Sequence, residues 1–224
     1  MRVILFGATG MVGQGVRREC LLDPDVDAVL SVVRRPSGPS MGRKSDKVRE
    51  LVTSTFRDLS EIESQFAGYD ACFFCLGVSS FRMKEAEYRR VTFDLTMAAA
   101  RAVLRANPQG MTFIYVSGAG TDSSEHGRVM WARVKGQTEN ALLAMGFTAA
   151  YMFRPAAIVP LHGITSKTPL YRVIYAGMKP FLPLMLKMFP QYVTTTEQVG
   201  RAMLAVAKHG YPKQVLEAGD IASF

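Results

Sequence analysis

Three glycines after the first apolar run of the chain have the spacing of a phosphate-binding turn. The sequence GATGMVG at residues 7–13 follows the apolar run Val3–Phe6 and leads directly into a segment with helical periodicity. In such a strand–turn–helix unit, one glycine makes the tight turn, one lets the backbone approach a pyrophosphate, and one lets the helix pack closely on the strand. Free amides and the helix dipole then hold the negative charge. In this position the glycines indicate dinucleotide binding rather than an ordinary turn.

A pair of arginines ends the second apolar run and bears on the choice of cofactor. An NAD site usually carries Asp or Glu there, to accept a hydrogen bond from the ribose 2′-hydroxyl. The sequence instead has Arg34 and Arg35, with no acid beside them. Guanidinium groups suit a 2′-phosphate, so the pair favours NADP(H), and Arg43 and Lys44 would enlarge the same basic patch. The alternative is a pair of solvated surface arginines.

The strands and helices that must position these residues can be predicted from the sequence pattern. Short apolar runs alternate with longer segments of helical period, which is typical of a parallel sheet with helices on its faces. The predicted strands are Val3–Phe6, Ala28–Val33, Val48–Thr53, Ala71–Cys75, Thr112–Ser117 and Thr148–Phe153. The predicted helices are Met11–Leu22, Lys84–Ala106, Val129–Met145 and Thr195–Lys208, the last with capping-box residues at its start. We therefore expect a doubly wound parallel sheet, the Rossmann fold, as a single domain over residues 1–224. A small C-terminal elaboration on the substrate side, residues 159–193, is expected to form a lid.

The composition is that of a globular protein with an anionic partner. The 224 residues are 48% apolar and 21% charged, which excludes a mainly disordered chain. The net charge of +8 fits a phosphorylated cofactor, an acidic lipid or a nucleic acid, but no interleaved basic and aromatic motif supports the nucleic acid. The most apolar stretch, residues 169–190, is interrupted by Arg172, Lys179 and Lys187, so no membrane span is expected. Three cysteines cannot form a disulfide framework, which predicts a reducing compartment, and we expect the cytoplasm.

The chain resembles the atypical short-chain dehydrogenase/reductases, and among them the Tat-interacting-protein-like oxidoreductases, close to the NmrA-like and epimerase-like NAD(P)-binding proteins. The resemblance runs over most of the chain. It rests on the glycine turn, the arginine pair, Cys75-Leu76-Gly77, Ser117-Gly118-Ala119, Lys135-Gly136 and Phe153-Arg154-Pro155. It implies an NADPH-binding Rossmann protein with Asp58 and Leu59 facing the adenine. The cofactor-lining positions that it implies, with the turn glycines included, are Gly7, Thr9, Gly10, Met11, Val12, Gly13, Arg34, Arg35, Leu76, Gly77, Lys135 and Ile158.

The catalytic residues of this superfamily are a serine at the end of the fifth strand and a tyrosine and a lysine four residues apart on the next helix. Ser117 and Lys135 match the serine and the lysine, but Trp131 stands where the tyrosine is expected. Residues i and i+4 share a helix face, so Trp131 should point towards the same nicotinamide as Lys135. An indole N–H donates a hydrogen bond but does not exchange a proton near neutral pH. Either another group supplies the proton or the protein binds cofactor without ordinary turnover; the candidate donors are Ser79, Ser80, Tyr88 and Tyr171.

Two further groups of residues do not predict a site. Cys72 and Cys75 have the C-x-x-C spacing, but residues three apart in a strand point to opposite faces. His126, His162 and His209 are scattered, with no cysteine or carboxylate at ligand spacing, so no metal site is predicted.

The function that fits these observations best is an NADP(H)-dependent oxidoreductase acting on a small carbonyl or alcohol. The alternative is a non-catalytic NADPH-binding protein that regulates or contacts another protein, because Trp131 replaces the expected tyrosine. The expected partner is accordingly a small-molecule substrate or a protein, and the expected state is a monomer or a homodimer.

Overall fold

A computed structural model describes residues 1–37, 45–165, 188 and 192–224. Seven strands form one parallel sheet in the order β3-β2-β1-β4-β5-β6-β9. Their bounds are β1 (Arg2–Phe6), β2 (Ala28–Val33), β3 (Val48–Val52), β4 (Ala71–Phe74), β5 (Thr112–Val116), β6 (Ala149–Arg154) and β9 (Val215–Glu217). The strand order reverses between β1 and β4, and ligands of doubly wound sheets bind at this point, outside the carboxyl ends of the strands. The prediction of a Rossmann-type α/β fold is confirmed.

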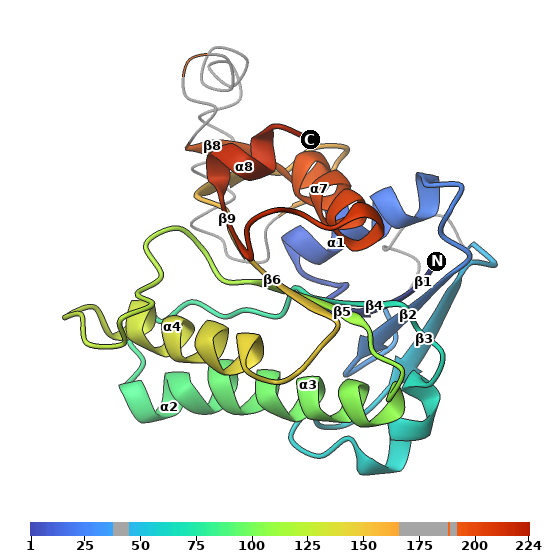
Figure 1. Ribbon diagram of the computed structural model, residues 1–224, viewed down its shortest axis with the longest axis horizontal. Coiled ribbons are helices and arrows are strands. Elements are labelled where there is room, and N and C mark those ends of the chain that lie inside the picture. Colours follow the sequence, from blue (N-terminus) through green and yellow to red (C-terminus); the bar gives the residue numbers. More distant parts are fainter. Residues whose placement is uncertain (38–44, 166–187, 189–191) are drawn as a thin grey trace.

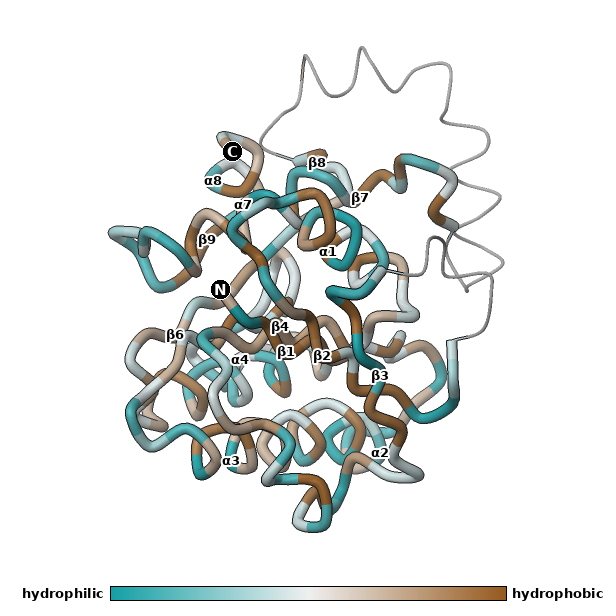
Figure 2. The backbone as a smooth tube through the Cα atoms, turned by 90° about the vertical axis from the view of Figure 1, so that its right-hand side faces the viewer, coloured by the Kyte–Doolittle hydropathy of each residue, from teal (hydrophilic) through white to brown (hydrophobic). Residues whose placement is uncertain are grey.

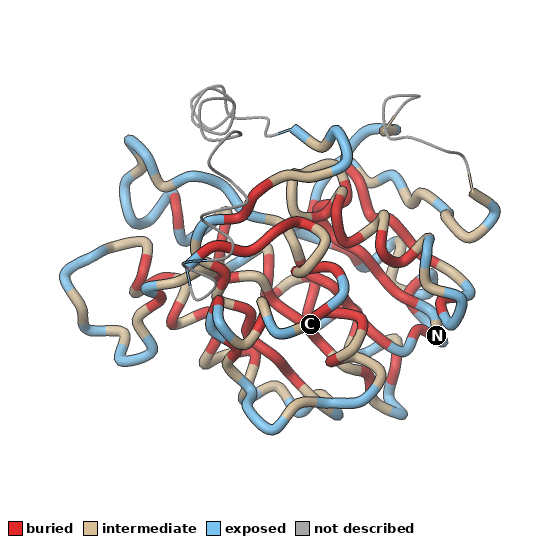
Figure 3. The backbone as a smooth tube through the Cα atoms, turned by 90° about the horizontal axis from the view of Figure 1, so that it is seen from above, coloured by how far each residue is buried: buried red, intermediate tan, exposed pale blue. Residues whose placement is uncertain are grey.

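Helices cover both faces of the sheet (Figure 1). On one face lie α1 (Met11–Leu22), α7 (Thr196–His209) and α8 (Ala218–Ala222); on the other lie α2 (Glu85–Arg89), α3 (Leu95–Ala106) and α4 (Met130–Leu143). Alternate residues of β1 enter the two cores: Val3 and Leu5 pack on the α1 and α7 side, and Ile4 and Phe6 on the α3 side. The five inner strands are therefore buried along most of their length, as Figure 3 shows, whereas no residue of the edge strand β3 is fully buried. Figure 2 shows the hydropathy of the same elements.

The glycine turn and the capped helix lie where the sequence predicts them. Helix α1 begins at Met11 and ends at Leu22, as predicted. Thr195 is the N-cap of α7, and its hydroxyl accepts a hydrogen bond from the backbone N–H of Gln198, which closes a capping box.

The predicted helix Lys84–Ala106 is interrupted. A π-helical turn, Arg90–Asp94, separates α2 from α3, and the Thr96 hydroxyl donates to the Thr92 carbonyl oxygen at 2.5 Å beside it. A single π-helical turn inserts one extra residue, and the residues on either side keep the helical spacing. Sequence periodicity therefore does not distinguish such a turn from a continuous α-helix.

Several short elements were not predicted. They are a 3-10 helix (Ser60–Phe66), the parallel pair β7 (Ala157–Val159) and β8 (Val193–Thr195), strand β9 and helix α8. Three-residue strands are too short to show a period. The predicted lid at 159–193 lies mostly outside the described residues, together with Tyr171, Arg172, Lys179 and Lys187, and so do Arg43 and Lys44. Within the described residues, no helix has the length and apolarity needed to cross a bilayer.

Candidate functional site

The glycines of the first turn have different structural roles. Gly7 has a φ of +84°, and a Cβ there would lie 2.7 Å from the carbonyl carbon of Cys75. A Cβ on Gly13 would lie 2.1 Å from the Gly7 carbonyl oxygen, so this glycine allows α1 to pack on the turn. Both are required by the fold itself.

Gly10 is different, because the fold does not need its lack of a side chain. It is the N-cap of α1 with φ −80° and ψ 165°, and a Cβ there would meet only the Gly7 carbonyl oxygen, at 3.3 Å. No side chain caps this helix, and its first turn carries no acid. The start of α1 thus offers bare amides and the positive end of the helix dipole to an anion.

A pocket of about 730 Å³ opens beside this turn. Its volume lies in the usual range for small-molecule sites. The described residues that line it are Gly7, Ala8, Thr9, Gln14, Val32, Val33, Arg34, Arg35, Pro36, Ser37, Ser54, Phe56, Leu76 and Thr165. They join the turn after β1, the ends of β2 and β3, and the start of the loop after β4. The cavity therefore lies at the carboxyl edge of the sheet, at the point where the strand order reverses between β1 and β4, as expected for this fold.

The basic edge of the pocket is formed by Arg34 and Arg35, which are exposed at the end of β2. No Asp or Glu is among the described lining residues. The nearby acid is Glu50 on β3, which accepts hydrogen bonds from the backbone N–H of Ser37 at 3.2 Å and from the Ser37 hydroxyl. The pocket edge is therefore cationic where an NAD site usually carries an acid.

Asp58 and Leu59, the two residues predicted to face the adenine, follow β3 and are not among the described residues that line the pocket. Asp58 does not line the pocket; its carboxylate accepts from the backbone N–H of Ser60 at 2.9 Å, and this hydrogen bond lowers the pKa of Asp58. Leu59 is buried in the core on the α3 side. The residues that line the pocket here are Ser54 and Phe56, which directly follow the strand. The rule that ligands bind outside the carboxyl ends of parallel strands could have identified them.

Helix α4 places Trp131 and Lys135 on one face, at a second location next to the end of β5. The Lys135 Nζ lies 5.8 Å from the centroid of the Trp131 ring and donates a hydrogen bond to the carbonyl oxygen of Ser117. Burial lowers the pKa of the Lys135 ammonium to about 8, and the carboxylate of Glu139 opposes that shift. Both side chains lie against glycines: a Cβ on Gly118 would be 3.6 Å from Lys135 Nζ, and one on Gly120 would be 3.5 Å from Trp131.

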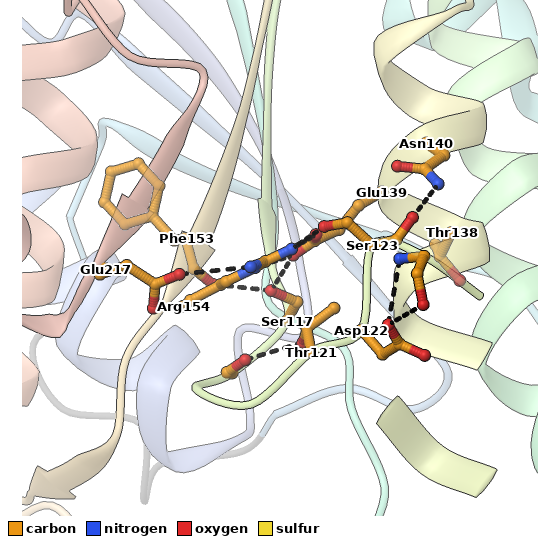
Figure 4. A network of polar contacts seen from close by, with 12 residues as sticks. Ser117, Thr121, Asp122, Ser123, Thr138, Glu139, Asn140, Phe153, Arg154 and Glu217 are labelled. Carbon is orange, nitrogen blue, oxygen red and sulfur yellow. Dashed lines mark hydrogen bonds and ion pairs between the residues drawn. The ribbon is translucent and has the colours of Figure 1, made fainter. Parts of the chain in front are cut away.

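The hydroxyl of Ser117 is buried and points into a polar network between β5, β6 and α4 (Figure 4). It donates to Glu139 at 2.5 Å and also contacts the carbonyl oxygen of Phe153 at 3.1 Å. Glu139 is 1% exposed and forms an ion pair with Arg154, whose Nε lies 3.0 Å from the carboxylate. Arg154 also contacts Glu217 at 3.2 Å and the Ser123 hydroxyl at 2.5 Å. Sequence reasoning missed Glu139, although it lies one helical turn beyond Lys135.

The remaining predicted residues lie apart from the described pocket lining. Met11 and Val12 are half-buried in the first turn of α1, Gly77 is exposed after β4, and Ile158 is buried on β7. Of the candidate proton donors, Tyr88 is buried in α2, and burial raises its pKa. Ser79 and Ser80 lie on the loop after β4, where Ser79 is exposed, and Tyr171 is outside the described residues.

The strand order and the phosphate-type turn define a Rossmann-fold protein. The sequence profile of the NAD dependent epimerase/dehydratase family matches residues 3–128, more than half of the chain. The protein belongs to this family. The fold is similar to that of WbmF from Bordetella bronchiseptica, solved in complex with NAD+, with a TM-score of 0.67, 17% identity, and coverage of 99% of this chain and 76% of that one.

Curated relatives correct one expectation. The chain is 23% identical over 161 residues to protein FMP52, mitochondrial, of Candida albicans, covering 71% of this chain and 68% of that protein. It is 29% identical over 165 residues to protein fmp52-1, mitochondrial, of Aspergillus terreus, covering 70% of this chain and 66% of that protein. The chain thus spans about two thirds of their length. Because these relatives are named mitochondrial, the cytoplasmic expectation is wrong. Few cysteines exclude a disulfide framework, but they do not choose between compartments that keep thiols reduced.

Proposed function

We propose that the protein is an NADP(H)-dependent oxidoreductase of the atypical short-chain type, in the Tat-interacting-protein-like branch, acting on a small carbonyl or alcohol. The observation that carries the proposal is the cationic edge of the pocket, with Arg34 and Arg35 and no acid among its described lining residues. Guanidinium groups attract a 2′-phosphate, which a carboxylate there would repel. Membership of an NAD dependent family supports a nicotinamide dinucleotide as the occupant.

The residues present fit this cofactor. The amides at the start of α1 would hold the pyrophosphate, which the bare Gly10 lets approach, and Thr9 would line the same turn. Arg34 and Arg35 would hold the 2′-phosphate, and Phe56 would pack against the adenosine end. The cofactor supplies or accepts the hydride. The side chains of Trp131 and Lys135 would serve the reacting end, one turn apart on α4.

Cofactor choice is tested by calorimetric titration of NADPH and NADH into the wild type and Arg34→Glu. The substitution removes a hydrogen bond to a charged group, a loss of about 1.5–3 kcal/mol, and adds repulsion. We expect NADPH to bind at least about tenfold more weakly, with NADH changed far less. Arg101→Glu makes the same change of charge at an exposed position on α3, outside the pocket lining, and should alter neither affinity. Equal losses for both cofactors in Arg34→Glu would remove Arg34 from the 2′-phosphate site.

Turnover is tested by NADPH oxidation with a panel of aldehydes, ketones and quinones. Oxidation of cofactor in step with loss of a carbonyl supports the reductase. Tight NADPH binding with no turnover on any substrate would instead support the alternative of a cofactor-binding regulator.

A further inference from the structure

A carbonyl reduction needs a proton on the substrate oxygen, and the residue expected to give it is absent. Trp131 stands at the tyrosine position, and its indole N–H does not exchange a proton near neutral pH. The geometry around Trp131 therefore decides which other group can serve.

Several candidates are already engaged. The Ser117 hydroxyl is buried and donates to Glu139, and Tyr88 is buried in α2. His162 pairs with Glu197 of α7 at 2.5 Å, on the opposite face of the sheet from α4. The serine and the histidine would have to leave their partners, and the tyrosine its buried position, before any of them could reach a substrate.

Lys135 has a different environment. It is half-buried, and within the described chain its one hydrogen bond goes to a main-chain carbonyl, that of Ser117. No carboxylate of the described residues forms an ion pair with it, since Glu139 is paired with Arg154. An ammonium group carries three protons, so two remain for other acceptors. The loop glycines Gly118 and Gly120 leave the Lys135 and Trp131 side chains facing bare backbone.

We propose that Lys135 is the proton donor of this enzyme, acting directly on the substrate oxygen in place of the missing tyrosine; the inference rests on the proposed reductase function. An N–H bond of the Lys135 ammonium breaks and an O–H bond forms on the former carbonyl oxygen, while the carbon receives the hydride that reduced nicotinamide supplies. The products are the alcohol and the oxidised cofactor. The neutral Lys135 amine then takes a proton from water. Trp131 shields the reacting end and holds the lysine side chain against the loop.

The electrostatics agree with this role. Burial brings the pKa of Lys135 to about 8, close to the range in which a general acid works best, and the Glu139 carboxylate keeps it from falling further. Elements packed against α4 carry other charges. These are Glu85, Glu87 and Arg89 on α2, Arg90 and Asp94 in the π-helical turn, Arg101 and Arg105 on α3, and Arg154 on β6. Of the charged groups, Glu139 alone is a cause of the shift in the pKa of Lys135. Glu85 is paired with Arg133, and Asp94 is paired with Arg89.

The first test measures the titration of Lys135 without substrate. Lysines labelled with 13C at Cε are followed by NMR from pH 6 to 11 in the wild type and in Lys135→Arg, which identifies the signal by its loss. We expect the Lys135 signal to titrate with a midpoint near its pKa of about 8, well below the ordinary lysine value of about 10.4. A midpoint for Lys135 at the ordinary value would overturn the proposal.

The second test measures turnover. Lys135→Arg keeps the charge, but arginine holds its proton too tightly to donate it, so kcat should fall about 10²–10⁴-fold, far more than the affinity for NADPH. In the wild type, kcat should fall about tenfold between pH 7 and 9, because a group with a pKa of about 8 loses its proton there. His126→Gln removes an exposed histidine from the loop after β5 and serves as the control, with turnover unchanged.

The outcomes separate the two proposals. Turnover in Lys135→Arg close to that of the wild type would overturn the proton-donor role and leave the reductase function standing. No turnover by the wild type on any carbonyl, with NADPH bound, would overturn both. A loss of turnover in His126→Gln equal to that in Lys135→Arg would also count against Lys135 as the donor.

Discussion

Two glycines of the first turn, three residues apart, should respond to substitution in opposite ways. In Gly13→Ala the new methyl group would lie 2.1 Å from the Gly7 carbonyl oxygen, 2.7 Å from the Gly7 carbonyl carbon and 3.0 Å from the Cα of Ala8. All three atoms are backbone, so no side chain can move away. Overpacking of this kind costs about 1–3 kcal/mol, and occasionally more. For a domain of this size, we expect Tm to fall by about 2–12 °C.

Gly10→Val should leave the fold nearly intact. Its φ of −80° suits any L-residue, and the single close atom, the Gly7 carbonyl oxygen, would lie 3.3 Å from the new Cβ. Valine is a poor N-cap residue, so the expected loss of stability is about 1 kcal/mol. Binding should suffer much more, because the isopropyl group would cover the amides of the first turn. Loss of two hydrogen bonds to a charged pyrophosphate, at about 1.5–3 kcal/mol each, weakens binding by about 10²–10⁴-fold.

The assay combines thermal unfolding by circular dichroism without ligand and calorimetric titration of NADPH. We expect Gly10→Val to lose NADPH while it melts near the wild type, and Gly13→Ala to melt lower. Undiminished NADPH affinity in Gly10→Val would refute the placement of the pyrophosphate. A wild-type Tm in Gly13→Ala would refute the argument that this glycine is required by the packing of α1 on the turn.

The remaining predictions concern α4. Trp131→Tyr combined with Lys135→Arg places a phenol one turn from the lost proton donor and should recover part of the roughly 10²–10⁴-fold loss in the rate of NADPH oxidation; no recovery in a folded double variant would show that the position does not face the substrate. Glu139→Gln leaves the Arg154 guanidinium, whose side chain is 11% exposed, with Glu217 as its remaining ion-pair partner, and should lower the free energy of unfolding by about 3 kcal/mol, measured by urea denaturation. Glu139→Leu combined with Arg154→Met should recover much of that loss, and a double variant as unstable as Glu139→Gln would contradict the assignment of the loss to a broken buried ion pair.

The sequence predicted the sheet well because its five inner strands are buried on both faces. Such strands are continuous apolar runs, so β2 was predicted with its observed bounds and the other long strands within one residue at each end. Helix α1 was predicted in full, since the glycine turn fixes where it starts. The three-residue strands β7, β8 and β9 could not be predicted, because their pairing depends on residues far away in the chain.

The residues of the candidate site were likewise predictable only in part. The pocket residues Gly7, Thr9, Arg34 and Arg35 lie at the ends of predicted strands, and position in a parallel sheet is enough to bring them together. Asp58 was predicted by resemblance to face the adenine; in the structure its carboxylate accepts a hydrogen bond from the backbone N–H of Ser60, the first residue of the 3-10 helix. The direction of the Ser117 hydroxyl was not predictable, because its partner Glu139 comes from a helix 22 residues further along the chain.

The two ends of the candidate site differ in how independently their residues can be changed. At the pocket end, Arg34 and Arg35 are exposed, so substitutions there should have little effect on folding. At the other end, Lys135 donates to the carbonyl of Ser117, the Ser117 hydroxyl donates to Glu139, and Glu139 pairs with Arg154. A change to any residue of this hydrogen-bonded network is expected to alter the packing, the charge and the protonation of Lys135 together, since residues in one buried network do not act independently. Trp131 lies on the surface of this network rather than within it, with no hydrogen bond from its ring to Glu139 or Arg154 among the described contacts. A change of the aromatic residue at this position should therefore leave the lysine and the groups that hold it in place.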